Sequence, residues 1–116
     1  MTHEEFTSSL SLLEKVDTTK PDPEKIQIFL KDMEQKLEQE KPESVQLFRA
    51  RIGILREALN DSSGLPHYEG LSIVFTVLDH VAELCKDIKD FVEEQNTLLI
   101  KLSKDQFLAP PALEKN

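Results

Sequence analysis

The sequence predicts an all-α protein, an elongated up-and-down bundle of four helices with a long last helix. Apolar residues recur at spacings of three and four along most of the chain, which is the period of a helix with one buried face. Only three Gly occur, too few for a β fold with many tight turns. Residues 71–102 contain neither Gly nor Pro, so nothing there interrupts a helix.

The size and composition of the chain are those of one folded domain. Its 116 residues fit a single domain. Leu, Ile, Val and Phe make up about 31% of the residues, above the roughly 20% below which chains tend to stay disordered. We expect a helical domain over residues 1–105 and a C-terminal tail over 106–116 that is flexible, because chain ends are poorly ordered unless tied down.

The first two helices have clear start signals. Thr2 followed by Glu5 is a capping-box pattern and predicts a first helix over residues 3–16. Asp22 followed by Pro23 predicts the start of a second helix over 23–40, because Asp caps free amides and Pro suits the first helical position. The apolar residues of these two helices are Phe6, Leu10, Leu13, Val16, Ile26, Phe29, Leu30, Met33 and Leu37.

Pro42 predicts a break or a sharp kink near residues 41–43, because proline inside a helix costs about 3 kcal/mol. A third helix is expected over residues 43–60. The run NDSSGLPHYEG at 60–70 is the clearest loop of the chain. The apolar face of the third helix comprises Val45, Phe48, Ile52, Leu55 and Leu59.

The fourth helix is expected over residues 70–104, with an apolar seam whose spacing alternates between three and four, as in a heptad repeat. A second row at every seventh position is also apolar, which makes the buried face wider than that of a two-stranded coiled coil. Phe75 and Ala82 widen the first half further, so we expect that half to be the central helix of the bundle. The second half is narrower and carries Gln95 in its seam. The seam is Val74, Leu78, Val81, Cys85, Ile88, Val92, Gln95, Leu99 and Leu102, and the second row is Val77, Leu84, Phe91 and Leu98.

The fourth helix is longer than a compact domain of this size. A straight helix over residues 71–104 spans about 51 Å, whereas a compact domain of this length has a diameter of roughly 35 Å. Two explanations stay open. The second and third helices stack nearly end to end through a kink at Pro42, or a partner covers the end that carries Leu98, Leu99 and Leu102.

Other residues are candidates for partner binding. Arg49, Arg51 and Arg56 are the only arginines and all lie in the third helix; they either pair with the acidic long helix or contact an acidic partner. Gly53, in mid-helix, is expected to allow close packing inside the bundle. Leu47 and Ile54 lie off the main apolar face of that helix and form a second contact face or pack within the bundle. Phe107 and Leu108 in the tail either fold back or dock on another protein.

Several classes of function are disfavoured. The three His are scattered, and no nucleophile, phosphate-loop or metal-ligand motif occurs, so we expect no enzyme activity, cofactor or metal. The net charge of −8 disfavours nucleic acid. No apolar run approaches the roughly 20 residues that span a bilayer. The single Cys85 suits a reducing compartment, and a cytoplasmic location is expected.

The function expected from these features is a non-catalytic protein–protein interaction module. It would serve as an adaptor or a small subunit of a larger helical assembly, with a helical partner or a second copy bound through the long helix and the arginines. The alternative is an acidic chaperone or escort that holds an amphipathic client helix.

Overall fold

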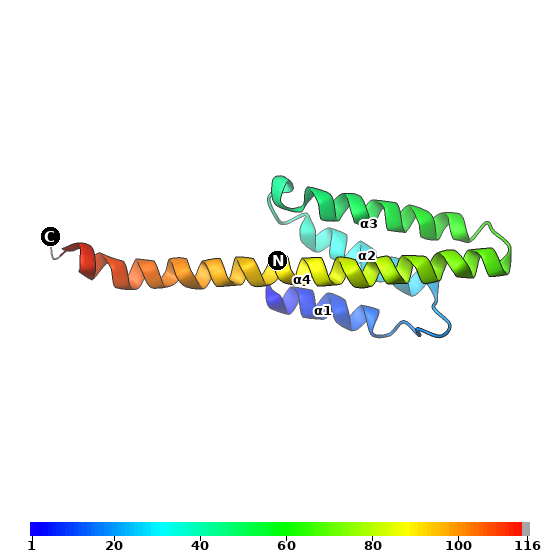
Figure 1. Ribbon diagram of the computed structural model, residues 1–116, viewed down its shortest axis with the longest axis horizontal. Helices are drawn as coiled ribbons and strands as arrows, with labels where there is room; N and C mark the ends of the chain where they lie inside the picture. Colours follow the sequence, from blue (N-terminus) through cyan, green and yellow to red (C-terminus); the bar gives the residue numbers. More distant parts are fainter. Residues whose placement is uncertain (115–116) are drawn as a thin grey trace.

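A computed structural model describes the backbone of residues 1–114 and the side chains of residues 1–101. Its four helices are α1 (His3–Leu13), α2 (Pro23–Leu37), α3 (Pro42–Ser62) and α4 (His67–Glu114). They alternate in direction, and each packs against two others: α1 and α3 both contact α2 and α4 (Figure 1). The all-α bundle predicted from the sequence is confirmed, and no strand occurs in residues 1–114.

The predicted start signals of the first three helices are used. The Thr2 hydroxyl accepts a hydrogen bond from the Glu5 amide at 3.1 Å, and the Glu5 carboxylate accepts one from the Thr2 amide at 2.9 Å. The Asp22 carboxylate accepts the amide of Glu24 at 2.9 Å, and Pro23 opens α2. Helix α3 begins at Pro42. Each start therefore satisfies free amides locally or places a proline where no amide partner is needed.

Helices α2 and α3 lie side by side and antiparallel, so the predicted end-to-end stacking through Pro42 is wrong. Gln27 donates a hydrogen bond to Asn60 at 3.0 Å, and Arg56 donates one to Glu34 at 2.8 Å. Lys41 is extended, with φ −62° and ψ 129°, because a following proline disfavours the helical conformation. The chain therefore reverses between Leu37 and Pro42 instead of bending gently.

Six helix ends differ from the predicted ones, and those of α3 differ by only one residue at its start and two at its end. Helix α1 ends at Leu13 and α2 at Leu37, each three residues early. Helix α4 begins three residues early, at His67, because the Pro66 carbonyl already accepts the Gly70 amide at 2.8 Å. It runs to Glu114, ten residues beyond the predicted end.

The extended α4 takes in most of the tail predicted over residues 106–116. Pro110 and Pro111 lie in the last turns of this helix, which ends three residues after Pro111. The predicted flexibility of the tail stays a prediction.

The core lies between the four helices and contains residues from each of them. Phe29, Ile52, Leu84 and Ile88 are among the fully buried side chains. The one buried hydroxyl between α1 and α2 belongs to Ser9, which donates to Asp32 at 2.7 Å and accepts from Lys36 at 2.8 Å. Since its polar atoms have partners, this buried group is tolerated.

The first half of α4 is not a central helix. Its seam and the second row are buried, as at Val77 and Leu84, but Phe75 and Ala82 are exposed. Helix α1, with 11 residues, is the shortest of the four helices. The exposure of Phe75 and Ala82 shows that this part of α4 is not covered on all sides.

Helix α4 sets the length of the molecule. Its 48 residues span about 72 Å at 1.5 Å per residue, which agrees with the longest dimension of 73 Å. The other three helices end well before it does, and α4 continues alone past the start of α1 (Figure 1). Because α2 and α3 do not stack end to end, nothing in the bundle matches the length of α4.

Candidate protein-interaction site

Glu40 marks the place where α4 leaves the bundle. It lies in the turn between α2 and α3 and contacts two other parts of the chain. Its carboxylate lies 2.5 Å from the amino group of Met1 and accepts a hydrogen bond of 2.9 Å from the Gln95 side chain. The polar residue that interrupts the apolar seam of α4 is therefore part of a contact that closes this end of the bundle.

The surroundings of Glu40 stabilise its charged form. Burial alone raises the pKa of this carboxyl, but the contacts with the Met1 amino group and with Gln95 outweigh that effect. The pKa of Glu40 consequently lies below its ordinary value, and the contact is charged at neutral pH.

Beyond Gln95, the described side chains of α4 lose the cover of the other helices. Leu98, Leu99 and Ile100 are 56%, 65% and 52% exposed. Successive helical residues point about 100° apart, so these three side chains cover more than half of the circumference of α4. In a helix built to end in water these positions would be polar. We call residues 98–101, together with the backbone of α4 up to Glu114, the α4 extension.

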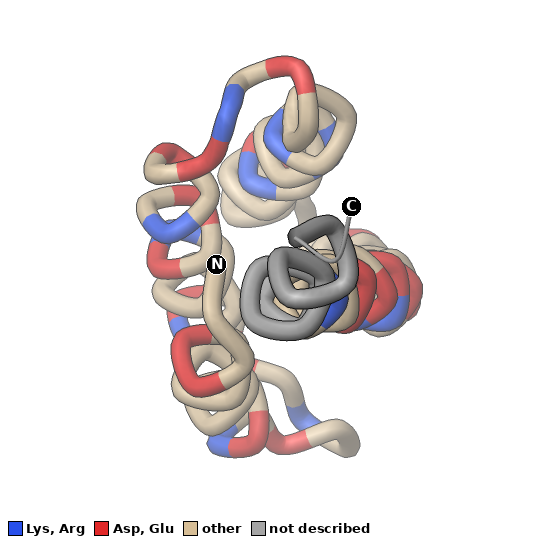
Figure 2. Tube along the Cα trace, turned by 90° about the vertical axis from the view of Figure 1, so that its left-hand side faces the viewer, with Lys and Arg blue, Asp and Glu red and all other residues tan. Residues whose placement is uncertain are grey.

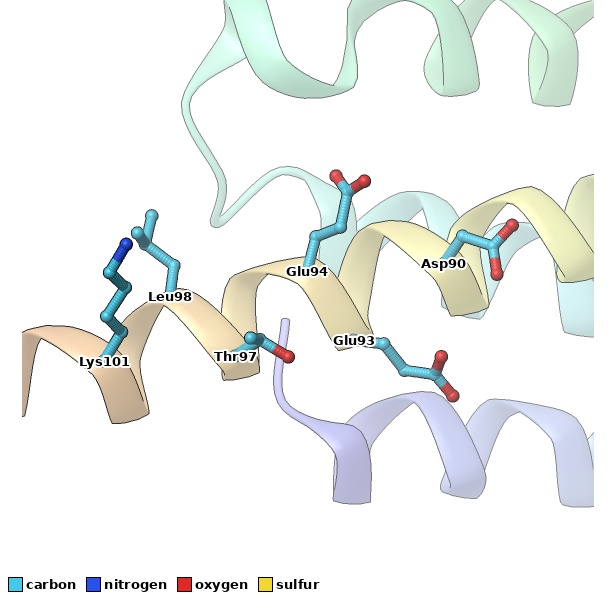
Figure 3. Close-up of a pocket in the computed structure, with 6 residues that line it drawn as sticks. All are labelled: Asp90, Glu93, Glu94, Thr97, Leu98 and Lys101. Carbon is cyan, nitrogen blue, oxygen red and sulfur yellow. The ribbon is translucent and has the colours of Figure 1, made fainter.

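Two hollows lie beside these leucines. One, of about 370 Å³, is formed by the start of α1, Glu40 and α4, and both Leu98 and Leu99 line it. The other is lined by α4 alone: Glu94 and Leu98 point toward the α3 side, whereas Glu93 and Thr97 point toward the α1 side (Figure 3). The second hollow is thus an open surface around one helix, which suits contact with a protein better than enclosure of a small molecule.

The predicted arginines do not form one surface. Arg51 donates to Asp87 of α4 at 2.8 Å, and Arg56 donates to Glu34 of α2 at the same distance. Arg49 lies 4.0 Å from Glu38, with both side chains largely exposed. The pairing of Arg51 with α4 is one of the two alternatives left open by the sequence, while Arg56 pairs with α2 instead. Their predicted role in partner binding stays a prediction, as does that of Leu102, Phe107 and Leu108, whose side chains lie outside the described residues.

Two further apolar residues are exposed on α3, and the sequence left their role open. Leu47 is 77% exposed and Ile54 is 66% exposed. They lie seven residues apart, on the side of α3 next to α4, where they line two hollows of about 400 and 160 Å³. The spacing was the available signal, but it does not distinguish a solvent-facing row from a buried one.

Gly53 is not explained by packing inside the bundle. A methyl group added at this position meets no atom within 4 Å, so the predicted close contact with another helix of the same chain is wrong. The glycine lies on the open side of α3, one residue before Ile54.

The chain matches no protein-family model, no curated protein and no solved structure.

Among residues 1–101, no group of three or more His, Cys, Asp and Glu side chains is placed to hold a metal ion. Cys85 is half-buried, and burial raises the pKa of its thiol to about 11, so at neutral pH the thiol is protonated and a poor nucleophile. In the described part of the chain no helix is apolar enough over a sufficient length to cross a membrane.

Charge is unevenly distributed along the chain. Residues 98–114 carry two Lys and two acidic residues, for a net charge of zero, whereas residues 1–97 carry −9. Figure 2, viewed along the bundle, shows acidic positions along the side of α4 that faces away from the other helices. The α4 extension therefore differs from the bundle in charge as well as in exposure. The exposed acidic residues among the described side chains of α4 are Glu69, Asp79, Glu83, Asp87, Asp90, Glu93 and Glu94.

Proposed function

We propose that this protein is a non-catalytic interaction module, an adaptor or a small subunit of a larger helical assembly, which binds its partner through the α4 extension. The observation that supports the proposal is the exposure of Leu98, Leu99 and Ile100 on a helix that continues past its own bundle. The bundle holds the root of this helix through Glu40 and Gln95 and leaves its end available.

The exposed apolar side chains of the α4 extension can supply the free energy of binding. Burying a whole Leu or Ile side chain contributes about 1.5–3 kcal/mol, so the exposed halves of these three residues offer a few kcal/mol to a partner. An isolated helix shorter than about 12–15 residues is marginal in water. A partner that packs on the extension supplies the tertiary contacts that stabilise it.

The remaining parts of the proposal rest on composition. A net charge of −8 favours protein partners over nucleic acid. One cysteine with a protonated thiol fits a reducing, cytoplasmic location better than a disulfide-bonded extracellular one.

The test compares two double variants of the full chain. Leu98→Glu with Leu99→Glu places charge on the α4 extension, while Ile28→Glu with Tyr68→Glu places the same charge on exposed apolar residues elsewhere. We expect both variants to keep the helical circular dichroism and the unfolding midpoint of the wild type. Only the first is expected to lose association, measured by sedimentation and by chemical cross-linking in extracts of the source cells.

Two results would count against the proposal. Equal association of the wild type and of the Leu98→Glu, Leu99→Glu variant would exclude the extension as the binding surface. Cooperative unfolding of that variant, without a change in association, would show that these leucines belong to the core.

A second candidate is an acidic escort for an amphipathic client helix. The hollows beside Leu47 and Ile54 favour it, because they form an apolar groove between two helices with acidic residues nearby. An escort keeps one unstable client soluble, so co-expression with that client raises the yield of soluble client. An adaptor subunit instead forms a complex of defined stoichiometry with its partner.

A further inference from the structure

Leu98 of the α4 extension lies on the same side of α4 as the exposed apolar residues of α3. Phe91 of α4 packs edge-on against Phe48 of α3, with ring centroids 5.5 Å apart. Leu98 lies seven residues after Phe91 and points toward the same α3 side (Figure 3). Leu47 neighbours Phe48 and lines a hollow with it and with Asp87. Leu98, the Phe48–Phe91 pair and the hollow at Leu47 therefore follow one another along this side of α4, with the acidic Asp90 and Glu94 between Leu98 and the pair.

The groove leaves room for a closely packed helix. Ala50 and Gly53 are exposed between Leu47 and Ile54, and a methyl group at Gly53 would meet only open space. Small residues flanked by large apolar ones let another helix approach the backbone closely. At the far end, Ile54 and His80 line the same hollow, so the groove reaches position 80 of α4.

The α4 extension of a second copy has the length to fill this groove. Two α4 helices can pair antiparallel with the two-fold axis at Leu98. A residue that follows Leu98 by a given number of positions in one copy then lies beside the residue that precedes Leu98 by the same number in the other copy. Residues 102–114 of one copy then lie beside residues 82–94 of the other. This is the stretch that contains Asp87 and Phe91 and that ends two residues from His80.

The charges are complementary in the same arrangement. The groove side of α4 carries Asp87, Asp90 and Glu94, all exposed, and only Asp87 has an arginine partner among the described residues. Lys101 of the antiparallel copy falls beside position 95, next to the acidic Glu94, and position 104, also a Lys in the sequence, falls beside position 92. A parallel pair would instead place the acidic stretches of the two copies side by side, which is unfavourable.

We infer that the partner of the α4 extension is a second copy of this chain, bound antiparallel so that each extension lies in the α3–α4 groove of the other copy. This inference rests on the proposed function and names its partner. The contact is the same on both copies, as in a two-fold dimer. It covers Leu98, Leu47 and Ile54 in one contact.

A disulfide tests the crossing point. In a Cys85→Ser background, Leu98→Cys places the new thiols of the two copies next to each other, because a residue at a two-fold crossing faces itself. We expect a covalent dimer after mild oxidation of the full chain. Ser72→Cys in the same background is the control, since this exposed residue lies far from the crossing and is expected to give none. Equal yields of covalent dimer from both variants, or none from Leu98→Cys, would overturn the arrangement.

Sedimentation of groove variants tests the rest of the contact. We expect Leu47→Glu with Ile54→Glu to weaken the dimer at least tenfold while the helical circular dichroism is kept. A dimer that resists this change but is lost with Leu98→Glu and Leu99→Glu would overturn the groove contact and retain the extension as the binding surface. A wild-type chain that stays monomeric at tens of micromolar would overturn the second copy as partner. In that case the proposed function still stands if the leucine variants lose their cross-links in cell extracts.

Discussion

The side chain of Gln95 donates a hydrogen bond of 2.9 Å to the carboxylate of Glu40, which lies 55 residues earlier in the sequence. The contact joins α4 to the turn between α2 and α3 at the last level of the bundle. Val92, one turn before Gln95, is buried, and Leu99, one turn after it, is exposed. The Glu40–Gln95 contact thus separates the part of α4 that stabilises the fold from the part available to a partner.

Gln95→Glu tests this contact. The substitution removes the amide donor and places a second carboxylate beside Glu40, so we expect the free energy of unfolding to fall by about 2 kcal/mol. Urea denaturation measures the change. Thr97→Glu adds the same charge at an exposed position two residues later and is expected to change stability by less than about 0.5 kcal/mol. Equal effects of the two substitutions would contradict the role given to the contact.

The pH dependence of stability follows mainly from two partly buried carboxylates, because the third carboxyl with a lowered pKa, that of Asp17, which accepts hydrogen bonds from Thr19, is fully exposed to solvent. The pKa of Glu40 and that of Asp32 both lie below their ordinary values of 4.5 and 3.8. Burial raises the pKa of Asp32, but hydrogen bonds from Ser9 and Lys36 outweigh it. A group with a lowered pKa in the folded state stabilises the fold above its unfolded pKa, and this contribution is lost as the pH falls through the folded value.

We therefore expect a constant unfolding free energy at mildly acidic pH and a decline once the pH falls below 4.5. Glu40→Gln removes one of the two titrating groups and should make the decline shallower, as measured by urea denaturation at each pH. Curves of the same slope for the wild type and the variant would show that Glu40 does not contribute.

Leu84 and Leu98 occupy the same row of α4, two heptads apart, but differ in burial. Leu84 is fully buried, so Leu84→Ala is expected to lower the free energy of unfolding by about 2–5 kcal/mol. Leu98→Ala is expected to change the stability of the monomer by less than about 0.5 kcal/mol. Measurements in dilute solution, where association is negligible, make the comparison. A loss of several kcal/mol at Leu98 would place it in the core.

Gly53→Ala is expected to separate folding from association. The site is helical and open, so alanine should stabilise the monomer by about 0.5–1 kcal/mol. The Leu98→Glu, Leu99→Glu background keeps the chain monomeric for this measurement. In the wild-type background the same substitution is expected to weaken the dimer, because a methyl group enters the groove. Tighter association of Gly53→Ala would contradict close packing there.

The helices could be predicted from the sequence because their signals are local. The Thr2–Glu5 capping box, the Asp22–Pro23 start and Pro42 each act within a few residues, and each is used in the structure. The direction of the chain after Pro42 depends on how α3 packs on α2 through contacts such as Arg56–Glu34. No local pattern specifies such a contact, so the sequence alone did not exclude the end-to-end stacking of the second and third helices.

The candidate site could be predicted in part. The length of the fourth helix pointed to an uncovered end at Leu98 and Leu99, which the structure shows to be exposed. The prediction for Gly53 was wrong, because the cost of a glycine in mid-helix does not show which neighbour, if any, approaches it. The partner of Gln95 could not be foreseen either, since Glu40 lies in a turn and meets it only after the whole bundle forms.

Sedimentation equilibrium of the full-length chain at micromolar concentrations tests the central claim most directly, namely that the uncovered end of α4 is an association surface. The account predicts a mass of twice 13.3 kDa for the wild type and a return to the monomer mass in the Leu98→Glu, Leu99→Glu variant with its helical content unchanged. If the wild type and the variant had the same mass, both monomeric or both dimeric, the claim that the uncovered end of α4 mediates self-association would be contradicted.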